Sequence, residues 1–151
     1  MKRAYRRSNY DVTDTVQVSS PAAVRAAVLE LYAAAWPGAD LSTLGRAIDD
    51  FAALFGGRMP GYMGVDTVYH DLQHSLDMVL AATRLMAGYE RTAADGQRLG
   101  HERALAGIVT ALFHDAGYIR ETSEADVPNG AVFTRSHVTR SARFLARYLP
   151  R

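Results

Sequence analysis

The sequence predicts an all-α fold, a helical bundle of about five principal helices, on three observations. Apolar residues recur at three- and four-residue intervals over most of the chain. No segment shows the alternation of apolar and polar residues that is typical of strands. Proline and glycine stand where the helical patterns break. With 151 residues, 48% of them apolar and 22% charged, the chain has the size and composition of one globular domain.

The first two helices are expected over residues 21–36 and about 40–55. Ser20 can cap the first helix, with Pro21 at its first position, and the helix formers that follow run up to a Pro-Gly pair. The second helix ends at a Gly-Gly pair. Its apolar residues follow helical spacing: Leu41, Leu44, Ile48, Phe51, Leu54 and Phe55.

Three more helices are expected further along the chain. Asp66 or Thr67 can cap the third helix, which we expect to extend to about Arg91. Residues 104–113 are apolar with almost no polar face, which indicates a helix surrounded by other helices. A long loop rich in glycine, proline and asparagine follows, and residues 136–149 then form a last amphipathic helix.

Composition restricts the chemistry that the chain can carry. There is no cysteine, so histidine, aspartate and glutamate must hold any transition metal. The net charge of +1 is too small to indicate a nucleic-acid partner. We interpret residues 1–19 as a flexible basic tail before a single domain over 20–151. The lack of a secretory signal or a long apolar run predicts a cytoplasmic protein with no membrane partner.

Histidine and aspartate gather in two segments. His70 and His74 are four residues apart, which on one helix places both side chains on the same face, with Cβ atoms about 5–6 Å apart. His114 and Asp115 follow the apolar helix, where a carboxylate without a partner would be costly to bury. A divalent cation would offset that cost, and the negative end of the helix favours one. Taken singly, each residue could instead be a hydrogen-bonded structural group or a turn cap.

Mixed ligation by histidine and aspartate suits zinc, iron or manganese better than calcium, which prefers oxygen ligands alone. The predicted cofactor is therefore a divalent metal ion, with zinc, iron, manganese and magnesium as the candidates.

Two motifs carry a resemblance to a known family. VYHDLQHSLDMVLAATRLM, followed about forty residues later by ALFHDAGY, resembles the HD-domain metal-dependent phosphohydrolases, on the branch similar to cyclic-nucleotide phosphodiesterases. The pattern there is YHNxxHxxDV and then HD. Tyr69, His70, His74 and Asp77 match it, whereas Asp71 replaces the asparagine. The resemblance spans roughly residues 66–149.

The resemblance implies a role for each matching position. His74, His114 and Asp115 would be metal ligands, and His70 would be the general acid that protonates the leaving alcohol. Tyr69 and Asp77 would be supporting groups. The implied activity is metal-dependent hydrolysis of a phosphate ester, with a nucleotide or cyclic nucleotide as substrate. The alternative is a non-catalytic helical binding or regulatory module with a degenerate HD metal site.

The chain departs from the family near its end. The resembling proteins close the metal shell with an aspartate on a later helix, but no acidic residue follows Asp126. Either the chain is a shortened version of the domain, or another group fills the position. The candidates for that group are His137, Glu121, Glu124, water or a residue of a second copy. His137 could also serve a second metal or the substrate phosphate, or be a partly exposed histidine near a helix start. The arginines of this region are interpreted as a solvated face from which one could meet the phosphate: Arg135, Arg140, Arg143 and Arg147.

A homodimer is also predicted, from the last helix. Phe144, Leu145, Tyr148 and Leu149 form an apolar stripe at helical spacing. Later helices would help to cover such a stripe in the resembling families, so here a second copy could cover it. The alternative is that the stripe faces the other helices of the same chain.

Overall fold

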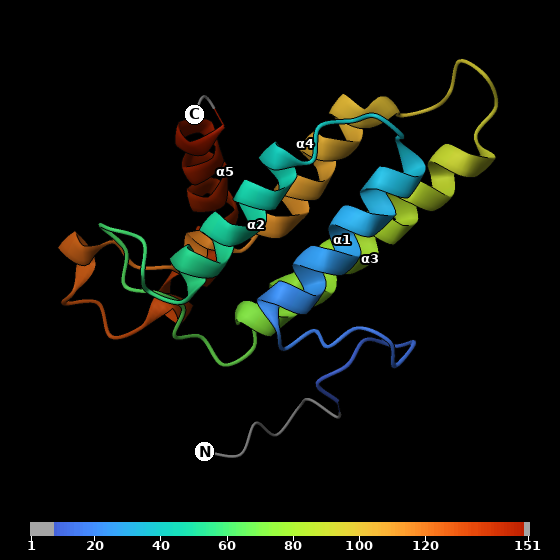
Figure 1. Ribbon diagram of the computed structural model, residues 1–151. Helices are drawn as coiled ribbons and strands as arrows, with labels where there is room; N and C mark the ends of the chain where they lie inside the picture. The colour runs from blue at the N-terminus through green and yellow to red at the C-terminus, as the bar shows by residue number, and fades with distance from the viewer. Residues whose placement is uncertain (1–7, 150–151) are drawn as a thin grey trace.

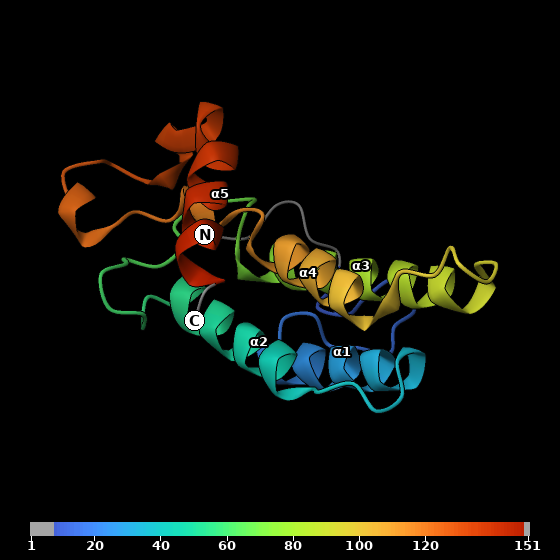
Figure 2. The same cartoon turned by 90° about the horizontal axis from the view of Figure 1, so that it is seen from above.

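A computed structural model describes residues 8–149, and its regular structure is helical. Helices α1 (Pro21–Ala35) and α2 (Ser42–Phe55) form one layer, and α3 (Leu72–Thr92) and α4 (Gly100–Phe113) form the other (Figures 1 and 2). Helix α5 (His137–Tyr148) lies across one end of these layers (Figure 1). Within residues 8–149, extended pairing is limited to two isolated bridges. The predicted all-α fold with five principal helices is confirmed.

The layers meet around a core of large apolar side chains. Phe113, at the end of α4, packs edge-on against Phe51 of α2 and lies 5.3 Å, between ring centroids, from Phe144 of α5. Fully burying one such side chain contributes roughly 1.5–3 kcal/mol. The hydroxyl of Tyr32 donates to the carbonyl of His101 at 2.8 Å and so joins α1 to α4. The end of α4 is thereby fixed in the middle of the fold.

The start of α3 differs from the prediction. The helix begins at Leu72 rather than near residue 66, because Asp71 is the N-cap and its Oδ1 accepts from the backbone N–H of His74 at 2.9 Å. Asp66 is occupied elsewhere, since its carboxylate accepts from the backbone N–H of Gly130 and from Arg120. His70 therefore precedes the helix, and the prediction that His70 and His74 share one helical face is wrong.

Helix α4 is not surrounded by other helices on all sides, although its apolar sequence predicted that it would be. Ile108, Leu112 and Phe113 are buried, but Ala106 and Thr110 are exposed, so α4 keeps one edge on the surface. The hydroxyl of Thr110 is satisfied within the helix, donating to the carbonyl of Ala106 at 2.8 Å. None of the helices in the described part of the chain has both the length and the apolarity that a membrane span requires.

The segment before α1 also packs more closely than a solvated tail would. Val18 is buried in the core, and Asp11 forms an ion pair with Arg84 of α3 at 2.7 Å. Residues 8–19 are therefore part of the folded body, contrary to the predicted boundary at residue 20. The basic residues of the predicted tail lie outside the described residues: Lys2, Arg3, Arg6 and Arg7.

The long loop between α4 and α5 contains three short 3₁₀ helices. These are η1 (Ala116–Tyr118), η2 (Thr122–Glu124) and η3 (Gly130–Arg135). Each spans only one or two turns, which is the usual length of this helix type. They carry the chain from the end of α4 around to the start of α5 (Figure 1).

The apolar stripe of α5 faces the protein's own core. Phe144 is 7% exposed and contacts Tyr62 and Phe113, while the hydroxyl of Tyr148 donates to Asp50 at 2.8 Å. Of the four stripe residues only Leu149 is exposed. The expected uncovered surface is therefore absent from the described residues, and the argument for a homodimer loses its basis.

Candidate metal centre

Asp115 occupies the centre of the candidate site. It follows His114, the C-cap of α4, and is 1% exposed although it carries a carboxylate. Burying such a group is unfavourable unless charges or hydrogen bonds compensate for the lost hydration. Here the compensation comes from histidines of three separate segments of the chain.

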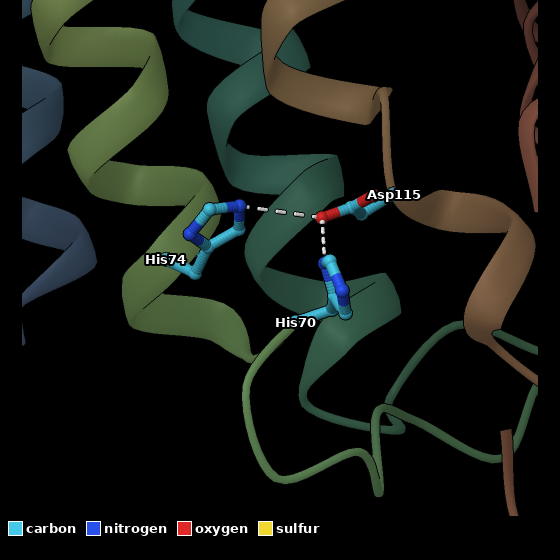
Figure 3. A group of neighbouring side chains, drawn as sticks. All are labelled: His70, His74 and Asp115. Carbon is cyan, nitrogen blue, oxygen red and sulfur yellow. Dashed lines mark hydrogen bonds and ion pairs between the residues drawn. The ribbon is translucent and has the colours of Figure 1, made fainter. Parts of the chain in front are cut away.

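Four imidazoles approach the two carboxylate oxygens of Asp115. His70 Nδ1 lies 2.8 Å from Oδ2, His74 Nε2 3.4 Å and His114 Nε2 3.1 Å. His137 Nε2 lies 3.9 Å from the other oxygen, Oδ1. Figure 3 shows His70 and His74 pointing at the carboxylate from two sides. Ligand atoms of His70, His74 and Asp115 all lie within 4.8 Å of one another, which is close enough to address one ion. Among the described residues this is the close group, so it contains His70, the expected general acid, and does not include the expected ligand His114.

Backbone carbonyls fix the orientation of two of these rings. His114 Nδ1 lies 2.7 Å from the carbonyl of Ala111, and His137 Nδ1 lies 2.8 Å from the carbonyl of Thr134. A carbonyl only accepts, so both Nδ1 atoms carry the proton. In the neutral form of each ring the lone pair is then on Nε2, the atom that faces Asp115. This is the usual arrangement of histidines that bind a metal through Nε2. In the protonated form of His114, Nε2 carries a proton instead and donates it to Asp115.

The charges of the site are strongly coupled. Burial alone would raise the pKa of the Asp115 carboxyl, but hydrogen bonds from His114 and His70 outweigh it and lower this pKa to about 2. The hydrogen bond to Asp115 raises the pKa of His114 above its ordinary value, despite some opposing desolvation. The carboxylate is thus held ionised, as a metal ligand must be.

A layer of contacts behind the site holds α5 against the turn that carries Asp115. The Ser141 hydroxyl donates to the carbonyl of His114 at 2.6 Å and accepts from the backbone N–H of Gly117 at 2.8 Å. Arg140 donates from Nε to the carbonyl of Gly117 at 2.8 Å. A Cβ on Gly117 would lie 2.0 Å from the carbonyl oxygen of His137, so only glycine fits there.

Tyr118 fills the space between the histidines. Its buried ring lies nearly parallel to those of His70 and His137, with centroids 4.4 Å away in both cases. Such offset contacts restrict the motion of both imidazoles.

The other predicted site residues lie in different surroundings. Tyr69 is exposed, and its ring packs beside those of His70 and His74 at the surface. Asp77 is half-buried on α3, one turn after His74. Arg135 is exposed at the end of η3.

The arginines of α5 are not simply a solvated face. Arg140 binds both oxygens of Glu124 at 2.8 Å and stacks over Phe133, and Arg147 pairs with Glu121 at 3.2 Å. These two glutamates, considered as replacements for the missing aspartate, are thus engaged by arginines instead. Arg143 is exposed.

Sequence reasoning missed Tyr118 and Ser141 as parts of the site. Tyr118 stands three residues after Asp115 in ALFHDAGY, so proximity in sequence could have indicated it. Ser141 gave no such signal, because its role depends on how α5 packs. Comparison with known proteins adds no assignment: no protein-family model, no curated protein and no solved structure matches the chain.

Proposed function

We propose that the protein is a metal-dependent phosphohydrolase that cleaves a phosphate ester, with a nucleotide or cyclic nucleotide as the substrate class. The single observation that supports it best is a buried carboxylate faced by four imidazoles from different segments. In the described residues, each oxygen of Asp115 has at least one histidine nitrogen within 4 Å. A purely structural aspartate needs far fewer partners.

His74, His114 and Asp115 would hold the ion. They offer two nitrogen atoms and one anionic oxygen, a donor set that suits zinc, iron or manganese, with magnesium a further candidate. When bound, such an ion lowers the pKa of its water and polarises a phosphoryl oxygen. The negative end of α4 points at the same place, and it adds to the attraction for a cation.

His70 would act as the general acid. Its Nδ1 donates to Asp115 at 2.8 Å, which fixes the orientation of the ring. The side chain is about one third exposed, so Nε2 can reach a bound substrate. Tyr118 and Tyr69 flank the ring and limit its rotation. Proton transfer from Nε2 to the leaving alcohol would then occur at the open side of the site.

One substitution with two readouts, metal content and hydrolysis, tests this role. His70→Ala should keep the metal but lose phosphodiesterase activity by roughly a hundredfold or more, the usual effect of removing a general acid. An ester with an activated leaving group, such as a nitrophenyl phosphodiester, should recover much of the rate because it needs little protonation. His101→Ala, an exposed histidine at the other end of α4, is the matched control.

Two results would contradict the proposal. Loss of metal in His70→Ala would show that His70 is a ligand, as its place in the close group also allows. Wild-type protein that binds no divalent ion would instead favour the non-catalytic helical module.

A further inference from the structure

His70 is held differently from the other three histidines around Asp115. His74 lies on α3, and the rings of His114 and His137 are each tied through Nδ1 to a backbone carbonyl. His70 precedes α3 in an irregular segment, and within residues 8–149 its ring is hydrogen-bonded to Asp115 alone. The orientation of this ring therefore depends on that one bond and on the rings that pack against it.

The main packing contact of His70 is with the ring of Tyr118. The two rings are stacked, with centroids 4.4 Å apart and 16° between their planes, and Tyr118 is 2% exposed. Tyr69 meets the same imidazole edge-on at 5.1 Å, but it is 60% exposed, so solvent leaves it room to move. Resting on the role of His70 proposed above, we propose that Tyr118 is the positioning residue of the general acid. Its ring keeps Nδ1 of His70 on Asp115 and Nε2 toward the open side of the site.

Tyr118 is itself fixed on both faces and through its backbone. Its second face packs against the ring of His137, again with centroids 4.4 Å apart and nearly parallel planes. His137 is anchored in turn, because its Nδ1 donates to the carbonyl of Thr134 at 2.8 Å. The backbone N–H of Tyr118 donates to the carbonyl of Asp115 at 3.1 Å, and Gly130 lies so close to the carbonyl of Tyr118 that no Cβ would fit. The tyrosine therefore cannot move away from the imidazole that it supports.

Stacking also suits a site that would bind an ion at Asp115. The hydrogen bond from His70 ends on Oδ2, the same oxygen that His74 and His114 approach. The lone pairs of this oxygen would be shared with a bound ion, which weakens the hydrogen bond from His70. The stack on Tyr118 involves only ring faces and takes no lone pair from the carboxylate. It can therefore hold the imidazole with or without a metal, as a preorganised acid requires.

The first test compares Tyr118→Leu with Tyr118→Phe on two phosphodiesters. Leucine removes the flat ring, so kcat for cyclic adenosine monophosphate should fall about ten- to hundredfold, the loss that follows a small misplacement of a reacting group. Hydrolysis of bis-nitrophenyl phosphate should fall much less, because its leaving group needs little protonation. Metal content should not change. Tyr118→Phe keeps the ring and should rescue most of the loss.

Tyr62→Leu is the matched control. It is the same substitution at a half-buried tyrosine whose ring packs on Phe144 instead of on an imidazole. A structural effect alone should change the rates for the two esters by the same factor, and we expect that pattern for Tyr62→Leu.

The second test needs neither metal nor activity. In proton NMR spectra of metal-free protein, the ring protons of His70, assigned with His70→Ala, should be shifted upfield because they lie over the face of Tyr118. Tyr118→Leu should remove this shift and Tyr118→Phe should keep it, while the signal of the exposed His101 stays in place. Tyr118→Met, which also lacks a ring, replaces the leucine variant in both tests if the latter does not fold.

Several results would overturn the inference. One is a His70 signal that is the same in wild type and Tyr118→Leu, since the rings would then not be stacked in solution. Others are equal losses on the two esters, no loss on either, or a Tyr118→Phe variant as impaired as Tyr118→Leu. A wild type that holds no metal or hydrolyses neither ester would refute the proposed function instead, while the NMR spectra would still test the contact between the two rings.

Discussion

Replacing Asp115 by asparagine removes one charge from the centre and almost no volume. The carboxylate is 1% exposed and is the only anionic group in the cluster that the structure brings together. We expect Asp115→Asn to weaken metal binding by more than about a hundredfold, since groups that merely orient a ligand already cost about 10–100-fold. Metal content after dialysis, measured by mass spectrometry, gives the result directly. Asp126→Asn, an exposed aspartate on the loop, is the matched control.

The same substitution should destabilise the protein even in chelator. The pKa of Asp115 falls from 3.8 to about 2 on folding, because hydrogen bonds from His114 and His70 outweigh the effect of burial. At about 1.36 kcal/mol per pKa unit, the ionised carboxylate contributes roughly 2 kcal/mol at pH 7. For a chain of this length that corresponds to a melting temperature lower by about 4–8 °C in Asp115→Asn.

The stability that the Asp115 carboxylate contributes should decrease as the pH falls. A lowered folded-state pKa gives stability that is present above the unfolded pKa near 4 and is lost as the pH falls toward 2. The difference in stability between wild type and Asp115→Asn, measured by thermal unfolding in chelator, should therefore have its largest value at pH 7 and decrease below pH 4. Full metal content in the variant would refute the assignment of Asp115. A stability difference that does not change with pH would refute the electrostatic reasoning.

Two further predictions concern the packing of α5. Gly117→Ala should lower the free energy of unfolding by more than about 1 kcal/mol in urea titrations, because the new Cβ would meet the carbonyl of His137 at 2.0 Å. Gly88→Ala, on an open face of α3, should be neutral or stabilising, and equal effects of the two substitutions would contradict the packing. Phe144→Glu should lower the free energy of unfolding by more than about 3 kcal/mol and so unfold the protein, because it places a charge in the core. A folded Phe144→Glu monomer derived from a wild-type dimer, seen by light scattering, would show instead that the residue lies at an interface between copies.

Much of the fold could be predicted from local pattern. Helical spacing of apolar residues depends only on neighbours three and four positions apart, so α1, α2 and α5 were found nearly to the residue. The same local logic placed His114 and Asp115 at the end of α4. The motifs also named His70 and His74, and the structure brings both to within 3.4 Å of Asp115.

Local pattern failed where a partner is distant in sequence. Asp66 and Asp71 are both good N-cap residues, and only the tertiary structure decides between them, because Asp66 bonds Gly130 and Arg120. Because Asp71 is the N-cap, His70 precedes α3, yet its ring still contacts Asp115 in the site.

The sequence by itself determined which residues form helices and which residue types could hold an ion. The tertiary structure decided the surroundings of those residues. It turned Phe144 inward and committed Glu124 to Arg140, and it brought His137 to the second oxygen of Asp115. The physical reason is that a helix is stabilised by contacts within a few residues, whereas burial and ion pairing depend on which segments meet. His137 and Asp115 stand 22 positions apart, and only the packing of α5 on the turn after α4 joins them.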